Sequence, residues 1–140
     1  MALFQISEPG LSAAPHEHRL AIGIDLGTTN SLVASVISGV AEVIADENGD
    51  VLLPSAVHYG EDGEVTVGRK ALVGAVDDAA NTITSAKRLI GRKLEDLKDV
   101  HAVPYRLVDD ATMVKIETRA GVKSPIEVSS EILRNLANRA

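Results

Sequence analysis

The chain has 140 residues, of which 45% are hydrophobic and 24% are charged, and it contains no cysteine, so disulfides, thiolate metal sites and a cysteine nucleophile are excluded. The formal net charge is −6, and no stretch concentrates lysine and arginine on one face. A nucleic-acid partner is therefore not expected, because binding phosphates requires a basic surface.

Residues 1–19 are predicted to form an extended leader, since Pro9, Gly10 and Pro15 stand among small and polar residues. The leader lacks the basic start and apolar run of a signal peptide. No stretch approaches the roughly 20 apolar residues of a transmembrane helix. We therefore predict a cytoplasmic protein without membrane contact. His16-Glu17-His18 could in principle hold a metal, although a solvated tail is the favoured interpretation.

Three β-branched or apolar runs follow, and tight turn signals separate them: Leu20–Leu26, Ser31–Ile37 and Ala41–Ala45. Short connections cannot support parallel pairing, so these runs predict an antiparallel meander, the central sheet of residues 20–54. The first strand is apolar on both faces. This pattern predicts a central strand rather than an edge strand.

Residues from about 55 to 128 are expected to form a smaller subdomain. It begins with a hairpin of Ser55–Tyr59 and Glu64–Val67 around an acidic, solvated turn. The spacing of Ile83, Ala86 and Ile90 predicts a helix over Thr82–Ile90, stopped by Gly91. The other expected elements are a helix at Arg69–Val76, a short turn at Leu94–Val100, and strands at Tyr105–Val108, Met113–Thr118 and Ile126–Val128.

Ser129 is predicted to cap a final helix over residues 129–140, the start of a helix returning to the central sheet. Ile132, Leu133, Leu136 and Ala140 share one face of this helix. No stop signal precedes Ala140, so we expect the chain to end inside the helix. That apolar face is expected to be exposed and prone to aggregation.

The strongest chemical signal is the string Ile22-Gly-Ile-Asp-Leu-Gly-Thr-Thr-Asn-Ser31. Asp25 would hold Mg²⁺, through water because this ion dehydrates reluctantly. Gly27 lets the backbone turn tightly, and the donors of Thr28, Thr29 and Asn30 would cradle phosphate oxygens. For a bare Asp-x-Gly, an ordinary hairpin turn is the favoured interpretation. The full ten-residue string favours the phosphate site.

Asp25-Leu-Gly-Thr-Thr-Asn-Ser31 resembles the first phosphate loop of the superfamily of actin, hexokinase and the DnaK-type heat-shock chaperones. Three further strings select the DnaK-type chaperone family: Leu53-Pro-Ser-Ala56, Val67-Gly-Arg-Lys-Ala71 and Asn81-Thr-Ile-Thr-Ser-Ala-Lys-Arg-Leu-Ile-Gly-Arg92. The resemblance runs from about Leu20 to Ala140. It implies an α/β, actin-like (ribonuclease-H-like) ATPase fold, of which this chain holds the first lobe only.

The resemblance also implies roles for individual residues. ATP and Mg²⁺ would bind between two lobes, with Asp25 matching the metal-associated aspartate and Gly27, Thr28, Thr29 and Asn30 matching the phosphate-contacting turn. Lys87 matches the catalytic lysine that reaches the γ-phosphate and the attacking water, and Arg88 matches an arginine near the cleft. Without the resemblance, a solvated helix lysine is the favoured interpretation of Lys87.

ATP hydrolysis in this family drives peptide binding and release, with a J-domain co-chaperone as partner. The leader is similar to that of HscA-type chaperones, which serve iron–sulfur cluster assembly, so the expected client is an iron–sulfur scaffold protein. Unfolded peptides are the alternative client, that of a general DnaK-type chaperone. An actin-like small-molecule kinase and a non-enzymatic binding module remain further alternatives. The second phosphate loop, the adenine pocket and the peptide-binding domain would lie beyond Ala140, so the chain alone is expected to be inactive.

Overall fold

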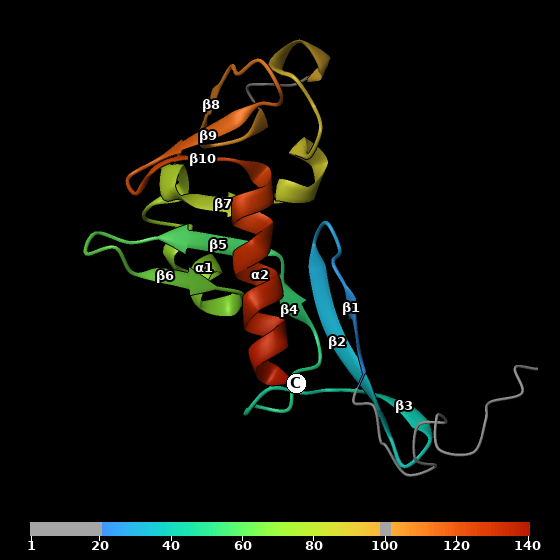
Figure 1. Ribbon diagram of the computed structural model, residues 1–140. Coiled ribbons are helices and arrows are strands. Elements are labelled where there is room, and N and C mark those ends of the chain that lie inside the picture. Colours follow the sequence, from blue (N-terminus) through green and yellow to red (C-terminus); the bar gives the residue numbers. More distant parts are fainter. Residues whose placement is uncertain (1–20, 99–101) are drawn as a thin grey trace, which may run out of the picture.

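The computed structural model describes residues 21–98 and 102–140 (Figure 1). Its strands fall into three antiparallel sheets beside one long helix, α2 (Pro125–Arg139). Within the two described ranges, no helix is long and apolar enough to cross a membrane. The predicted leader lies outside the described residues, as does the end of the turn predicted at Leu94–Val100, which begins as the 3-10 helix η3 (Leu94–Asp96).

The predicted meander is confirmed. Its strands pair in the order β1 (Ile22–Asp25), β2 (Asn30–Ile37) and β3 (Val40–Val43), and β4 (Leu53–Pro54) pairs with the start of β2. The central position predicted for the first strand is wrong for the described residues: β1 pairs with β2 alone, and Ile22 is 48% exposed. Apolar residues on both faces cannot by themselves place a strand centrally, because this also requires a second neighbouring strand.

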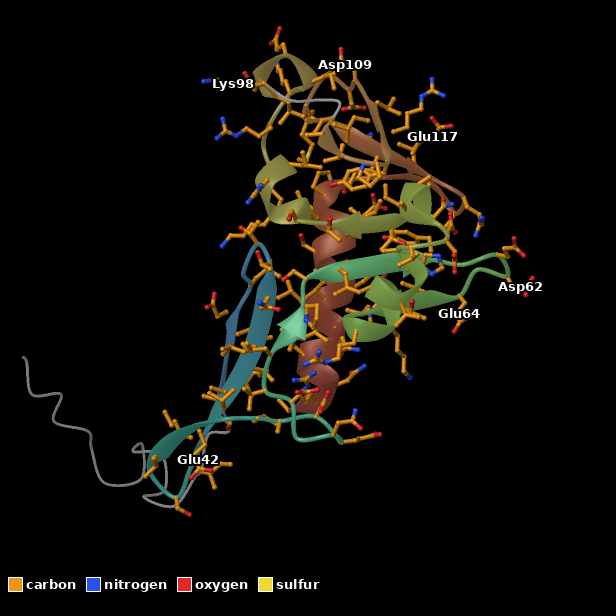
Figure 2. All side chains as sticks on the ribbon, turned by 180° about the vertical axis from the view of Figure 1, so that it is seen from behind. Glu42, Asp62, Glu64, Lys98, Asp109 and Glu117 are labelled. Atoms are coloured by element: carbon orange, nitrogen blue, oxygen red, sulfur yellow. The ribbon has the colours of Figure 1, made fainter. Side chains whose placement is uncertain are left out.

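The second sheet has the order β6-β5-β7 and contains the predicted hairpin, β5 (Ala56–Tyr59) and β6 (Val65–Val67). Asp62 is at the hairpin tip and points away from the body of the molecule, as predicted for a solvated turn (Figure 2). Helix α1 (Arg69–Gly74) ends two residues earlier than predicted. The third sheet joins β8 (Arg106–Val108), β9 (Lys115–Thr118) and β10 (Gly121–Lys123), which confirms two predicted strands in slightly shorter form.

The helix predicted at Thr82–Ile90 is wrong. A 3-10 helix, η1 (Ala79–Asn81), leads into a strand, β7 (Thr82–Thr84), and a second 3-10 helix, η2 (Ala86–Leu89), follows. Three β-branched residues in a row favour a strand, and β7 pairs with β5 while Ile83 is fully buried. Ser85 then adopts a left-handed conformation with φ of 56°, which ends the strand and turns the chain.

The predicted start of the final helix is also wrong, because residues 126–128 are helical rather than extended. Ser124 is the N-cap: its Oγ accepts a hydrogen bond from the Glu127 N–H at 3.1 Å, and its own N–H donates to Glu127 Oε2 at 2.7 Å. This capping box, with Pro125 in the first helical position, specifies a start five residues before Ser129. The hydrogen bond from the Ser124 N–H to the carboxylate holds the pKa of Glu127 below its usual range.

The apolar face of α2 is buried rather than exposed, because the helix packs on β2, β5 and η2. Ile132 and Leu136 are at most 2% exposed, whereas Leu133, at the edge of this face, is 37% exposed. The buried core draws on all three sheets and includes Val33, Leu53, Val57, Ile83, Leu89, Ile116, Val128, Ile132 and Leu136. The proposed division at residues 54 and 128 stays a prediction.

Candidate functional site

The connection between β1 and β2 carries five of the predicted site residues in one short turn. Asp25 ends β1, opposite Leu32 in the sheet register, and Asn30 begins β2. Asp25 is exposed, and its carboxylate forms no hydrogen bond or ion pair with any other described residue. This carboxylate is therefore not committed to a structural role within the described part of the chain.

Gly27 is required by close packing inside the turn, since a side chain there would collide with the carbonyl oxygen of Asn30. Its N–H donates to Ser31 Oγ at 3.1 Å, and its carbonyl oxygen accepts from Ser55 Oγ at 2.9 Å. The two serine Oγ atoms lie 2.8 Å apart, and both residues are buried. The turn thus has one defined shape, held by a buried serine pair.

Ser31 and Ser55 were not among the predicted site residues. Both lie within the strings that carried the family resemblance, Asp25–Ser31 and Leu53–Ala56. A small hydroxyl residue just after a glycine-containing turn can indicate a side chain that stabilises the turn through hydrogen bonds. However, the pairing of two serines 24 positions apart requires the fold.

The turn also contains backbone hydrogen-bond donors that the described residues leave unused. The N–H groups of Thr28 and Thr29 have no acceptor among the described residues, while the Thr29 carbonyl oxygen accepts from the Ser55 N–H at 2.8 Å. Successive backbone N–H groups in a turn suit an anion such as a phosphate. The described residues contain no group of three or more His, Asp or Glu side chains that could hold a metal. A metal ion at Asp25 would therefore need further oxygen ligands from water or from a bound molecule. Mg²⁺ usually keeps several water ligands in this way.

Lys87 and Arg88 lie on η2, where Ala86 and Leu89 are buried and the two basic residues are exposed. The predicted short helix around Lys87 is therefore a single 3-10 turn. In both views this turn lies next to the β1–β2 connection, beside the N-terminal half of α2 (Figures 1 and 2). The fold thus brings the two segments with predicted site residues to one side of the molecule.

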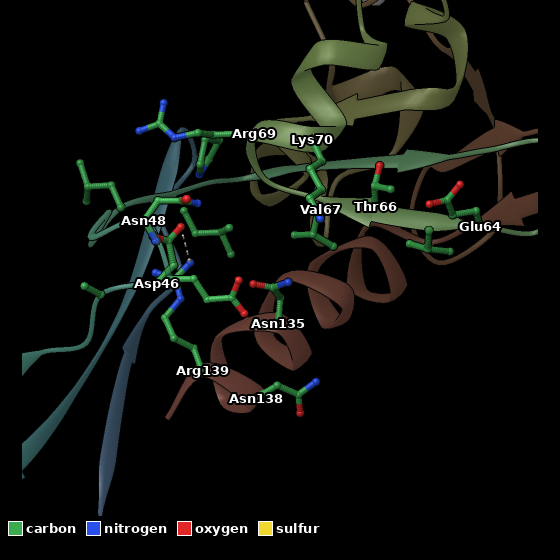
Figure 3. Close-up of a pocket in the computed structure, with 16 residues that line it drawn as sticks. Asp46, Asn48, Glu64, Thr66, Val67, Arg69, Lys70, Asn135, Asn138 and Arg139 are labelled. Carbon is green, nitrogen blue, oxygen red and sulfur yellow. Dashed lines mark hydrogen bonds and ion pairs between the residues drawn. The ribbon is translucent and has the colours of Figure 1, made fainter.

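A hollow of about 700 Å³ lies elsewhere among the described residues, and none of the predicted site residues line it. It is formed by the β3–β4 connection, β6, α1 and the end of α2 (Figure 3). Arg139 Nη1 donates to the carbonyl oxygens of Asp50 and Val51 at 3.3 and 3.5 Å. Asp46 accepts from the Asp50 N–H, which holds the pKa of Asp46 below its usual range. These contacts explain the hollow as a junction between α2 and the β3–β4 connection.

Comparison with known proteins identifies the class. The family model described as Hsp70 protein matches residues 21–140, and the chain belongs to the Hsp70 family. It is 60% identical to a chaperone protein HscA homolog of Methylobacillus flagellatus, and 61% identical to those of Chromobacterium violaceum and Laribacter hongkongensis. Each match covers 100% of this chain and 22–23% of the relative. The chain therefore spans less than a quarter of the length of these relatives.

Proposed function

We propose that this chain is the N-terminal part of an ATP-hydrolysing chaperone of the HscA type, with the first lobe of an actin-like fold. The observation that carries the proposal is the β1–β2 turn, where free N–H groups lie beside the uncommitted carboxylate of Asp25. Membership of the Hsp70 family and the identity to HscA homologs support the same function. We also propose that the 140-residue chain alone does not hydrolyse ATP.

ATP and Mg²⁺ fit the residues of the turn. Asp25 would hold Mg²⁺ through water, and the turn from Gly27 to Asn30 would bind phosphate oxygens, with the N–H groups of Thr28 and Thr29 as the available backbone donors. Lys87 would place a positive charge at the γ-phosphate, with Arg88 beside it. Bound Mg²⁺ supplies neutralisation of the charge on the phosphate oxygens.

Asp25→Asn in the full-length protein tests the metal role. ATP hydrolysis across a Mg²⁺ titration should require a higher Mg²⁺ concentration and reach a lower maximum, while the unfolding free energy stays within about 0.5 kcal/mol. Asp62→Asn is the matched control, because it makes the same chemical change at an exposed hairpin tip. A wild-type Mg²⁺ dependence for Asp25→Asn would refute the metal role.

The HscA homologs support an iron–sulfur scaffold protein as the client and a dedicated J-domain protein as the partner. ATP turnover by the full-length protein should then rise on adding both. Equal stimulation by unfolded peptides, with no effect of the scaffold, would favour the general DnaK-type chaperone. Stimulation by a sugar would favour a kinase. Location in the cytoplasm and the absence of a nucleic-acid partner stay predictions from the sequence.

A further inference from the structure

Tyr105 connects the third sheet to the strand that leads to Lys87. Its side chain is 4% exposed, and its hydroxyl donates a hydrogen bond to the carbonyl oxygen of Thr84 at 2.8 Å. Thr84 is the last residue of β7 and lies three positions before Lys87. Burial raises the pKa of Tyr105 to about 12, so the hydroxyl keeps its proton at neutral pH.

The next residue, Ser85, makes this hydrogen bond consequential. Its φ of 56° and ψ of 29° are left-handed, a conformation that is unfavourable for a non-glycine residue. The Arg88 N–H donates to the Ser85 carbonyl oxygen at 3.0 Å, so the turn that carries Lys87 begins directly from this strained residue. Such a conformation persists only where its surroundings hold it.

Other anchors of the turn lie on both sides of Lys87: before it, Thr84 pairs with Ala56 of β5 and Ala86 is 2% exposed. Leu89 is 5% exposed and packs in the core, and the Val114 N–H donates to the Arg92 carbonyl oxygen at 2.7 Å. Before the strained residue, the hydroxyl of Tyr105 provides the side-chain contact to the backbone. The exposed Lys87 is therefore held between two fixed points.

We propose that Tyr105 is a positioning residue, whose hydroxyl fixes the backbone at Thr84 and thereby directs Lys87 toward the β1–β2 turn. This inference rests on the proposed catalytic role of Lys87. A lysine that acts on charge developing during hydrolysis needs accurate placement, and a small displacement lowers the rate more than the ATP affinity.

Tyr59 supplies a matched control. It is the other tyrosine of the chain, is 3% exposed in the same core, and its hydroxyl forms no hydrogen bond with the described residues. Tyr105→Phe and Tyr59→Phe each remove one hydroxyl from a buried tyrosine, but only the first releases the Thr84 carbonyl oxygen. A purely structural role would affect both variants through stability alone.

The experiment combines each variant with Lys87→Ala in the full-length protein and measures single-turnover hydrolysis and ATP affinity. Tyr105→Phe should lower the hydrolysis rate about two- to tenfold, the range for one lost hydrogen bond, and change ATP affinity less than twofold. It should have no further effect once Lys87 is alanine. Tyr59→Phe should hydrolyse ATP at the wild-type rate.

Two results would overturn the inference and leave the proposed function intact. They are a wild-type rate for Tyr105→Phe, and an equal effect of Tyr105→Phe with and without Lys87. If Lys87→Ala itself hydrolyses ATP at the wild-type rate, the catalytic role of Lys87 fails and the inference fails with it.

Discussion

The hydroxyl of Ser55 donates a hydrogen bond to the carbonyl oxygen of Gly27 over 2.9 Å, across 28 positions of sequence. The Ser55 N–H also donates to the Thr29 carbonyl oxygen. One residue, directly after β4, therefore holds both sides of the β1–β2 turn. These bonds use the carbonyl oxygens of Gly27 and Thr29, while the N–H groups of Thr28 and Thr29 have no acceptor among the described residues.

Ser55→Ala should destabilise the turn. It leaves the Gly27 carbonyl oxygen without this donor, and losing a buried partner costs about 1–3 kcal/mol. Denaturant unfolding of the full-length protein should show a lower unfolding free energy, and calorimetry should show weaker ATP binding. Ser130→Ala is the control, since its hydroxyl bonds to a carbonyl oxygen on the exposed surface of α2. Equal stability of the two variants would contradict the bracing role.

Gly27→Ala should weaken ATP binding by about tenfold or more, because the added methyl group would collide with the Asn30 carbonyl oxygen and reshape the turn. Gly23→Ala is the control: it lies on the same strand–turn segment, and a side chain there meets nothing within 4 Å. Isothermal titration with ATP compares the two. Unchanged affinity for Gly27→Ala would show that the turn does not contact the nucleotide.

Asp78 joins the second and third sheets. Its carboxylate accepts hydrogen bonds from Asn81 at 2.7 Å and His58 at 3.1 Å, and it forms an ion pair with Arg119 at 2.8 Å. The hydrogen bond from Asn81, followed by that from His58, holds the pKa of Asp78 below its usual range. The charged carboxylate is therefore the form that stabilises the junction.

This pKa predicts a pH dependence of stability. Because the folded-state pKa is lower than the unfolded one, the contribution is present at neutral pH and is lost as pH falls through the folded-state pKa. Asp78→Asn should lower the unfolding free energy at pH 7 and flatten its decline between pH 5 and 3. Its exposed neighbour Asp77 gives the control, Asp77→Asn, which should follow the wild type. A variant Asp78→Asn with the wild-type pH profile would exclude this linkage.

The 140-residue chain alone should self-associate through the β2–β3 arm rather than through α2. Ile37 and Val40 are opposite each other in the register and are 50% and 59% exposed. Exposed apolar pairs on adjacent strands promote association. The double variant Ile37→Lys and Val40→Lys should reduce light scattering, whereas Val122→Lys on β10 should not. Equal effects of the two variants would contradict this assignment.

The turn was predictable because its chemistry is local. The runs Leu20–Leu26 and Ser31–Ile37 flank a short segment with glycine and hydroxyl residues, so the sequence indicates both the turn and its donors. Ser124 and Ser129 are both residues that can cap a helix, and only the combination of Pro125 and Glu127 distinguishes them. The capping signal is present in the sequence, but the segment Ile126–Val128 after Pro125 also indicates a short strand.

The remaining features depend on tertiary contacts. The spacing of Ile83, Ala86 and Ile90 is helical on paper, yet pairing with β5 makes its first part a strand. No local pattern predicts that Tyr105 bonds to a carbonyl oxygen 21 positions earlier. The exposure of β1 likewise depends on which elements cover it, and a single strand's sequence does not contain that information.

We propose that the β1–β2 turn and Lys87 act together on ATP. Single-turnover hydrolysis by Lys87→Ala in the full-length protein, with ATP affinity measured in parallel, tests it most directly. Lys98→Ala, at another exposed lysine, is the control. We expect Lys87→Ala to lower the hydrolysis rate by about two to four powers of ten, roughly 3–5 kcal/mol, with little change in ATP affinity. Wild-type turnover, or equal losses in rate and affinity, would contradict it.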